Sequence, residues 1–356
     1  MENSTKYSFS ALNPFVSSNK VDNTEKKVNN AEFLLWGSDN HYPDYLYGLY
    51  EDCATLQSVI NGTADFICGD AVESYIKECN KIGEKFEDIV RKIVYDYLIY
   101  GAFAIQVIKN PFGKVVEIYW VDMGKLRSDE KNEVFFYSDD WDKSVGRVKY
   151  IMYPKFNKED ENPTSIFFYK NDKSRKVYPS PLYNAAIDAA EIERKINDFH
   201  LNEISNNFLS SKIINFNNGT PDEEQKNEIE RAINEKFSGA ENAGRIMVAF
   251  NDNKENSVSV ENLGVDNFAD RYNALSERVE SQIFTAFRAT PALFGLPNKT
   301  TGFNSQEYSE AFKLYNRTTV KPIQKRIVDA FEKIYEVGII TIKPFNLENN
   351  AEKEVE

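Results

Sequence analysis

The residues best suited to chemistry in this sequence are a group of carboxylates and two histidines. Asp139, Asp140 and Asp142 stand close together in the segment SDDWD, and carboxylates in such a group could hold a divalent cation, as in a metal-dependent nuclease. Acidic loops between strands are common and no histidine accompanies this one, so the pattern favours a solvated loop. His41 and His200 lie far apart without a convincing nucleophile partner, and no catalytic pair is expected.

Neither phosphate chemistry nor thiol chemistry is indicated elsewhere in the chain. The sequence has no G-x-x-x-x-G-K-[ST] loop, so ATP hydrolysis is not expected of it. Cys53, Cys68 and Cys79 are odd in number and lack metal-ligand spacing. We expect them to be small, buried, apolar residues in a reducing cytoplasm. The sequence therefore predicts a protein that is not an enzyme, with no catalytic residue, no metal and no cofactor.

Length and charge limit the class of protein further. The chain has 356 residues, of which 41% are hydrophobic, and a formal net charge of −13. This size allows roughly two or three domains, or one elongated subunit with a sizeable core. No run approaches the roughly 18 apolar residues of a membrane span, and no signal-peptide pattern is visible, so no membrane partner is expected. The acidic balance counts against tight DNA binding by counterion release, but not against a surface that DNA passes without sticking.

The first half of the chain predicts a flexible arm followed by a mixed α+β domain. Residues 1–31 are polar and rich in Asn and Lys, which is typical of a flexible arm. Residues 32–180 combine helical spacing, from Pro43 onward and over 86–100, with short strand-like runs. The expected strands are 102–110, 114–122, 133–138, 147–153 and 164–170.

The second half predicts long helices on either side of a small insert. Ser180 as N-cap and Pro181 at the first helical position indicate a helix over 181–208. A compact β-α-β insert is expected over 209–262, and the apolar stripe of a second long helix lies within 263–290. Two long helices that leave a domain, carry a small module and return would make a stalk.

A third long helix is expected within 304–345. Pro322 stands in the middle of its apolar stripe, and because proline removes a ladder hydrogen bond we expect a kink near 317–321. A last strand is expected over 339–345, ahead of an acidic tail at 346–356.

The second and third helices are separated by FRATPALFGLPNKTTGFNSQEY, residues 287–308. A connection of this length inside a compact domain is usually functional or disordered. It contains two prolines, two glycines and the polar tip NKTTG, with apolar residues on both sides of the tip. We therefore expect its ends to be packed and its tip to reach a partner.

At this point the sequence resembles the portal proteins of tailed bacteriophages, in the version found with the HK97-like capsid system. The resemblance covers about residues 32–336 and depends on the order of its motifs more than on any single match. It is carried by the following stretches: WGSDNHYPDYL, LIYGAFAIQVIKNPFGKVVEIYWVDMGKLR, YPSPLYNAAIDAAE, GAENAGRIMV and FRATPALFGLPNKTTGFNSQEY.

The resemblance implies an α+β portal fold and a ring of typically twelve subunits at one capsid vertex of the virion, assembled in the host bacterial cytoplasm. Double-stranded DNA would pass through the ring non-specifically during packaging and ejection. The implied partners are the terminase large subunit, a head-tail adaptor, and the major capsid or scaffold protein. The implied parts are a mixed α/β wing (32–180), stem helices (181–208 and 263–290), a clip (209–262), a tunnel loop (291–303) and a long kinked C-terminal helix with the final strand (304–345). Because little sequence remains after residue 345, a large crown is in doubt.

The same resemblance implies roles for individual residues. The tunnel-loop tip that would reach DNA is Asn298, Lys299, Thr300, Thr301 and Gly302, and its anchors are Pro291, Leu293, Phe294, Gly295, Pro297 and Phe303. The stem candidates facing the channel are Arg194 and Lys195, and the clip candidates for partner binding are Asn217, Asn218, Gly219, Glu241 and Asn242. Lys299 could instead be a solvated loop residue, and the two stem residues could lie on an exposed helix face or form ion pairs between subunits.

Two alternatives to a portal subunit stay open. One is another head-neck or minor capsid protein, which would lack long stem helices flanking a clip. The other is a cytoplasmic metal-dependent nuclease that uses the SDDWD carboxylates, and it would form a small oligomer with metal-dependent turnover.

Overall fold

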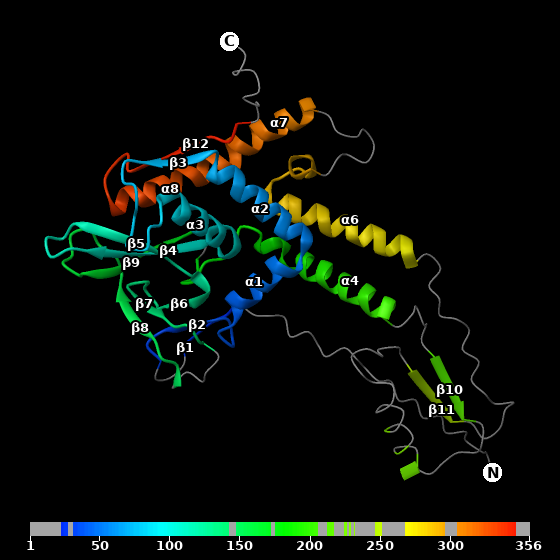
Figure 1. Cartoon of the computed structure of the whole chain (residues 1–356). Helices are drawn as coiled ribbons and strands as arrows, with labels where there is room; N and C mark the ends of the chain where they lie inside the picture. The colour runs from blue at the N-terminus through cyan, green and yellow to red at the C-terminus, as the bar shows by residue number, and fades with distance from the viewer. Residues whose placement is uncertain are drawn as a thin grey trace. The chain divides into compact units, whose positions relative to one another are not determined.

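The structure is a computed structural model, and it forms two compact units that we describe separately. The residues described are 23–27, 31–141, 147–171, 175–205, 212–216, 224, 225, 228, 231, 246–250, 268–295 and 305–346. The large unit comprises Lys20–Glu191 and Val279–Glu356, and the small unit comprises Ile192–Arg278 with residues 1–19. Figure 1 shows the elements of both units.

The strands of the large unit pair antiparallel in small sheets. The sheets are β1 (Glu25–Lys27) with β2 (Leu34–Trp36), β3 (Ala71–Ser74) with β12 (Ile340–Lys343), β5 (Val115–Val121) with β4 (Ala102–Lys109) and β9 (Thr164–Lys170), and β6 (Leu126–Ser128) with β7 (Val134–Tyr137) and β8 (Ile151–Pro154). The turn between β4 and β5 lies between the two strands expected at 102–110 and 114–122. Asn110 Oδ1 accepts hydrogen bonds from the backbone of Phe112 and Lys114, and Gly113 takes a φ of 76°, which glycine adopts at little cost.

Helix α3 is the most buried of the helices described in the large unit. They are α1 (Tyr42–Asp52), α2 (Ala54–Cys68), α3 (Phe86–Tyr100), α7 (Ser305–Tyr315) and α8 (Lys321–Ile334), with short 3₁₀ turns η1 (Met123–Lys125), η3 (Asn184–Ala186) and η5 (Pro291–Phe294). Helix α3 begins where the Asp88 carboxylate accepts the backbone N–H of Lys85, at 2.8 Å. It ends at Gly101, which takes the left-handed conformation common after a helix.

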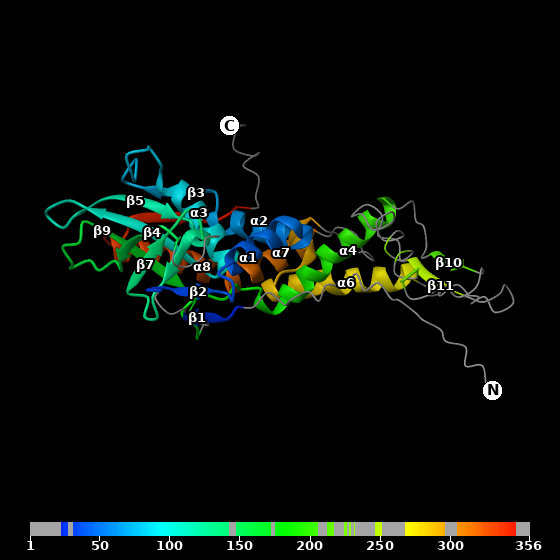
Figure 2. The same ribbon diagram turned by 90° about the horizontal axis from the view of Figure 1, so that it is seen from below.

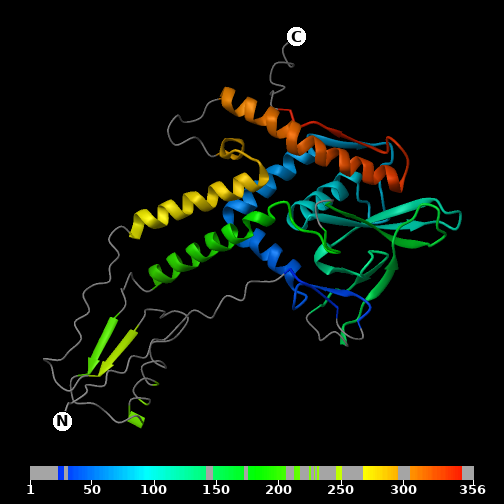
Figure 3. The ribbon, with the colours of Figure 1, turned by 180° about the vertical axis from the view of Figure 1, so that it is seen from behind.

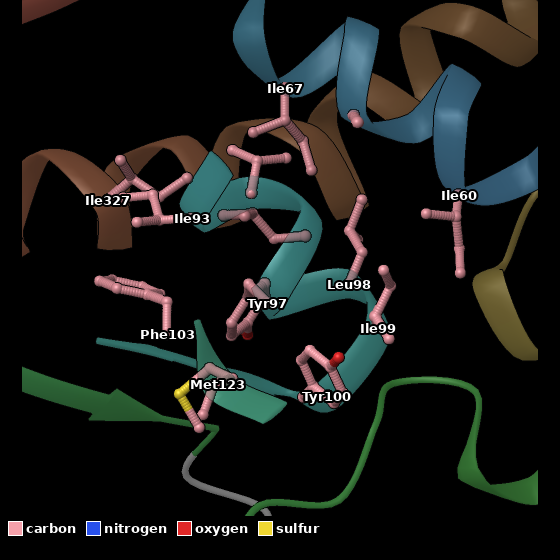
Figure 4. Packing of buried hydrophobic residues seen from close by; sticks show 14 of the residues in the cluster. Ile60, Ile67, Ile93, Tyr97, Leu98, Ile99, Tyr100, Phe103, Met123 and Ile327 are labelled. Carbon is pink, nitrogen blue, oxygen red and sulfur yellow. The ribbon is translucent and has the colours of Figure 1, made fainter. Parts of the chain in front are cut away.

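The core of the large unit lies between α2, α3, α8 and strand β4. Figure 4 shows Ile93 and Tyr97 of α3 close to Ile327 of α8 and Phe103 of β4. All four residues are at most 1% exposed. Phe86 of α3 also meets the ring of Phe331 edge-on, with 5.6 Å between centroids. The apolar stripes read from the sequence therefore meet in one shared core.

A buried arginine joins the turn after β2 to strand β6. Arg127 is fully buried, and its guanidinium donates to Asn40 Oδ1, Asn40 O, Gly124 O and Leu126 O at 2.6–2.9 Å. Its Cζ lies 4.8 Å from the ring centre of Trp141 and 6.0 Å from that of Trp36. We call these four side chains, of Arg127, Asn40, Trp36 and Trp141, the arginine cluster. Burial lowers the pKa of Arg127 to about 10.

The small unit contains parts of two long helices and a pair of strands. Helix α4 (Ile187–Ser205) and helix α6 (Phe268–Phe287) are divided between the units, and β10 (Lys212–Phe216) pairs in parallel with β11 (Ile246–Phe250). Within the small unit α4 and α6 lie side by side (Figure 2 and Figure 3), and Phe199 stacks on Tyr272 with 5.3 Å between ring centroids. Both strands of the predicted insert are thus confirmed, and residues 224, 225, 228 and 231 between them are helical.

The predicted flexible arm extends too far. Residues 25–27, expected within it, form β1, and Lys26 stands opposite Leu35 of β2. Tertiary contacts hold this polar segment, because Glu25 Oε1 accepts the backbone N–H of Tyr178 and Lys27 Nζ pairs with Glu130. A strand made of Glu and Lys has no apolar alternation by which the sequence could reveal it.

The predicted start of the helix at 181 is also wrong. Helix α4 begins at Ile187, so Ser180 is not its N-cap. Tyr183 is fully buried, donates its hydroxyl to Ile99 O at 3.1 Å and stacks on Phe287. Gly101 lets Ser180 approach so closely that a Cβ at residue 101 would lie 2.2 Å from its carbonyl oxygen. Packing of this segment overrides the local capping signal.

The helix ladder changes its hydrogen-bond pattern at the place where a kink before Pro322 is expected. A π-helical segment, η6 (Asn316–Val320), separates α7 from α8, and Pro322 lies in the first turn of α8. Because proline has no N–H for the helix ladder and crowds the preceding turn, a helix carrying it commonly changes its hydrogen-bond register there. No helix in the described part of the chain is both long and apolar enough to cross a membrane.

Candidate functional site

The candidate site is the chain leaving α6, which leads into the polar tip singled out by the sequence. After α6 ends at Phe287, Arg288 takes a φ of 57° and Thr290 is extended, so the helix direction is abandoned within a few residues. A 3₁₀ turn, η5, then begins with Pro291 and ends at Gly295, whose φ of 79° suits glycine. Proline and glycine thus set the two ends of this turn.

Phe294 of η5 is half-buried and packs against three aromatic rings of the large unit. Its ring centroid lies 6.0 Å from that of Phe66, 5.7 Å from that of Phe284 and 6.3 Å from that of Tyr315. The fourth wall is Gly62 of α2, where an added Cβ would lie 2.6 Å and 2.7 Å from two carbons of the Phe294 ring. We call Gly62, Phe66, Phe284 and Tyr315 the Phe294 seat. The adjacent Leu293 is 5% exposed.

The Phe294 seat is connected to the helix irregularity by Tyr315. The Tyr315 hydroxyl forms a hydrogen bond of 2.8 Å with Thr63 Oγ1 of α2, and the next residue begins the π-helical segment η6. Burial raises the pKa of Tyr315 to about 12. Tyr315, the last residue of α7, therefore contacts both the ring of Phe294 and a side chain of α2.

The structure places four of the predicted anchor residues and none of the predicted tip. Pro291, Leu293, Phe294 and Gly295 form η5 and its end as described above. The remaining segment residues, Pro297, Asn298, Lys299, Thr300, Thr301, Gly302 and Phe303, lie outside the described residues. The sequence pointed to Phe294 but not to Gly62, since nothing local marks a helical glycine as the contact of a ring so distant in the chain.

The predicted stem residues are described and the predicted clip residues are not. Arg194 is half-buried and Lys195 is exposed on α4, and both interact with other residues of the chain. The predicted clip residues Asn217, Asn218, Gly219, Glu241 and Asn242 lie outside the described residues.

The acidic segment SDDWD does not assemble a metal site among the described residues. Asp139 accepts hydrogen bonds from Lys125 Nζ and the Tyr137 hydroxyl, each at 3.0 Å, and the bond from Lys125 lowers its pKa most. Trp141 is buried in the arginine cluster, and Asp142 lies outside the described residues. No group of three His, Cys, Asp or Glu in the described part of the chain could hold a metal ion.

A cleft of about 640 Å³ beside this segment contains an acid that the sequence reasoning missed. Asp96 of α3 is 5% exposed, and burial raises its pKa well above the usual range. Its Oδ2 accepts the indole N–H of Trp120 at 2.7 Å. The available signal was an acid close to the apolar stripe of a helix, a position at which a charge needs a partner.

The three cysteines are buried, as the sequence predicted. Burial raises the pKa of Cys68 to about 11 and that of Cys79 to about 12. Both thiols are therefore protonated near neutral pH and poor nucleophiles.

Comparison with known proteins shows the family to which the chain belongs. The sequence pattern of the family described as phage portal protein matches residues 77–345. No curated protein matches the sequence. The chain therefore belongs to the phage portal protein family, a family of structural rather than enzymatic proteins, and serves as a portal subunit at a capsid vertex.

Solved structures share the fold. A chain in the neck of an empty gene transfer agent particle is 16% identical, with a TM-score of 0.53, and the match covers 87% of this chain and 86% of that one. A chain in the neck of the native particle, computed with C12 symmetry, is 16% identical, with a TM-score of 0.52 over 86% and 85%. An HK97 family phage portal protein from Corynebacterium diphtheriae is 8% identical, with a TM-score of 0.48 over 81% and 90%. The first two show that this mixed α+β chain has the fold of the neck proteins.

Proposed function

We propose that the chain closes into a ring of about twelve subunits around a channel for duplex DNA, with each subunit contacting the next through two different surfaces. The observation that carries the proposal is the family match, which runs from residue 77 to residue 345 and so spans the helices on both sides of the insert. The C12 symmetry used for a similar neck structure supports the subunit number.

The charge of the chain fits a conduit better than a clamp. Each subunit carries a formal net charge of −13, so a ring of them is strongly acidic. An acidic wall repels the phosphate backbone and leaves the duplex mobile, whereas a uniformly basic wall would hold it. In this proposal the channel guides DNA during packaging and ejection and does not bind it by sequence.

The parts of the portal fold are assigned within the same proposal. The wing (32–180) meets the major capsid or scaffold protein, and the stem helices (181–208 and 263–290) carry a clip (209–262) that docks the terminase large subunit and later a head-tail adaptor. Arg194 and Lys195 belong to the channel face of the stem, and the ring stands at a capsid vertex of the virion after assembly in the host cytoplasm.

The segment 291–303 is the tunnel loop in this proposal. Leu293 and Phe294 fix its first end in the large unit, so that the polar tip around Lys299 can reach DNA. We expect Lys299→Ala to impair packaging or DNA retention while rings still form. The matched control is Lys131→Ala, at an exposed wing position. Normal packaging by the Lys299 variant would contradict a role in holding DNA.

The first test of the ring is the mass of the purified assembly by native mass spectrometry, with negative-stain images of the same sample. A mass near twelve times 41.0 kDa, in particles with a central hole, is the expected result. A stable dimer or tetramer without a hole would overturn the proposal.

A further inference from the structure

The helices after the candidate site carry an unusual run of charge. Residues 311–328 contain five basic residues and no acidic residue, in a chain where acids outnumber bases by 56 to 43. Arg326 is directed into the large unit, where it donates to the Tyr97 hydroxyl at 3.1 Å. The other four are exposed: Lys313 on α7, Arg317 in η6, and Lys321 and Lys325 on α8. We call these four the basic stripe.

The π-helical segment keeps the basic stripe on one side. Lys325 follows Lys313 by about 1.2 residues more than three full α-helical turns. In a regular α-helix its side chain would therefore point about 120° away from that of Lys313. The wider turn of η6 takes up about one residue, or about 100°, so the remaining rotation is about 20°. The buried side confirms the extra residue, because Tyr315 and Val320, five residues apart, are each 2% exposed.

Most of the basic stripe is not neutralised within the chain. Lys313 Nζ pairs with Glu310 at 2.7 Å. Among the described residues, Arg317, Lys321 and Lys325 have no ion-pair partner. These three basic residues succeed one another every four residues, and no acidic residue lies in the sequence between them, so they leave a local positive surface.

We propose that the basic stripe binds the phosphate backbone of duplex DNA. Its basic residues follow one another every four residues, about 6 Å along the helix, and one DNA strand presents a phosphate about every 3.4 Å of its axis. Successive basic side chains can therefore reach about every second phosphate of one strand. A regular row of this kind fits a regular polyanion better than the irregular carboxylates of a protein surface.

This inference rests on the proposed function and adds to it a place where DNA is held. The acidic remainder of the ring repels the duplex, and one limited basic row per subunit supplies contacts that salt can release. The tunnel-loop tip is a separate element, so the two contacts can be tested independently.

The test measures the affinity of the full chain for a short mixed-sequence DNA duplex. Binding is monitored by the fluorescence anisotropy of the duplex at several salt concentrations. The stripe variant is Arg317→Gln with Lys321→Gln and Lys325→Gln. The control is Lys77→Gln with Lys114→Gln and Lys131→Gln, which removes the same three charges from exposed positions elsewhere in the large unit. We expect the stripe variant to bind at least about tenfold more weakly at low salt, with a salt slope reduced by about 0.9 for each lost phosphate contact. We expect little change in the control.

Each other outcome overturns the inference. Equal weakening in both triple variants would show a general effect of net charge, and unchanged binding by the stripe variant would place the DNA contact elsewhere. Polyglutamate that binds the chain more tightly than the duplex, through the same residues, would assign the stripe to an acidic protein. If the triple variant fails to fold, Lys321→Gln alone must still lower the salt slope. The mass of the assembly is read in parallel, so intact rings with unaltered DNA binding reject the stripe but not the portal ring.

Discussion

The arginine cluster and the Phe294 seat both fix a chain segment inside the large unit, and they do so by opposite means. Arg127 of β6 donates two directed hydrogen bonds to Asn40 in the turn after β2, and two more to the carbonyl oxygens of Gly124 and Leu126. Phe294 is held by rings and by a glycine surface, and the contacts to its side chain are apolar. The first arrangement works in one geometry only, whereas the second tolerates small shifts because apolar contact is non-directional.

This difference matches the position of each cluster relative to the candidate site. The arginine cluster joins elements within the large unit, away from the segment that leaves α6. The Phe294 seat lies at the base of the segment proposed to meet passing DNA, where one hydrogen bond, between Tyr315 and Thr63, stands beside the rings. We infer that apolar packing holds the base of the segment firmly, without the exact geometry that a set of directed hydrogen bonds would impose.

The largest expected effect is at the arginine cluster. Arg127→Leu leaves the carbonyl oxygens of Asn40, Gly124 and Leu126 without their donor in a buried place, and each such loss costs about 1–3 kcal/mol. Allowing for local relaxation, we expect the free energy of unfolding to fall by about 4 kcal/mol, measured by urea denaturation. Arg91→Leu is the control, because Arg91 is about half exposed in its ion pair with Asp65, and it should change stability by only about 0.5 kcal/mol.

A small fall in the free energy of unfolding of Arg127→Leu would contradict the view that directed hydrogen bonds hold the arginine cluster together. If the cost were below about 1 kcal/mol, the hydrogen bonds of the cluster would be dispensable, and cation–π and apolar contacts would explain its order. Arg127→Lys separates the two readings, since it keeps the charge but not the planar fork of donors.

The same contrast explains which parts of the fold the sequence could predict. The bounds of α3 follow from its apolar stripe and from Gly101 after its end, which are local signals. The strands β4, β5 and β9 were likewise visible as apolar runs next to turn residues. The start of α4 was not predictable, because the packing of Tyr183 against Ile99 decides it and neither partner is near the other in sequence.

The candidate site was predictable only in outline. Proline, glycine and the apolar residues of 291–295 marked the packed end of the segment, but Gly62 and Thr63 belong to a helix that precedes it by more than half the chain. The basic stripe needs the π-helical insertion to align it, because periodicity at 3.6 residues alone would have spread these basic residues over about 120° of the helix surface. Long-range contact and helix register are therefore the missing information in both cases.

The next largest effect is expected for Gly62→Ala, whose effect on stability should change sign when the Phe294 ring is removed. In the native chain Gly62→Ala forces its Cβ against the Phe294 ring, and overpacking of this kind costs about 1–3 kcal/mol. In a Phe294→Ala background the same change should stabilise by about 0.5–1 kcal/mol, because alanine is the better helix former. Urea denaturation of the four proteins of this double-mutant cycle measures the coupling.

Additivity in that cycle would contradict the Phe294 seat. If Gly62→Ala had the same effect with and without the Phe294 ring, the two residues would not share a contact. Phe112→Ala is a suitable control for the loss of an aromatic residue, since Phe112 is 94% exposed on the β4–β5 turn and should not couple to Gly62.

The smallest effect expected is at the hydrogen bond beside the seat, and its pH dependence makes it measurable. Tyr315→Phe removes the partner of the buried Thr63 hydroxyl, which should cost about 1 kcal/mol at neutral pH. Tyr47→Phe, at a residue 44% exposed, is the control.

Burial raises the pKa of Tyr315 from 10.0 to about 12, so the unfolded chain releases the phenolic proton at a lower pH than the folded one. The stability contributed by the buried neutral phenol is thus complete below about pH 10 and is lost as the pH rises towards 12. Phenylalanine has no such proton, so the gap in stability between native chain and variant should narrow over this range and then reverse, because two pKa units correspond to about 2.7 kcal/mol. A gap that is constant from pH 8 to pH 11.5 would show that Tyr315 is not a buried phenol of raised pKa, and the seat would then contain a solvated hydroxyl.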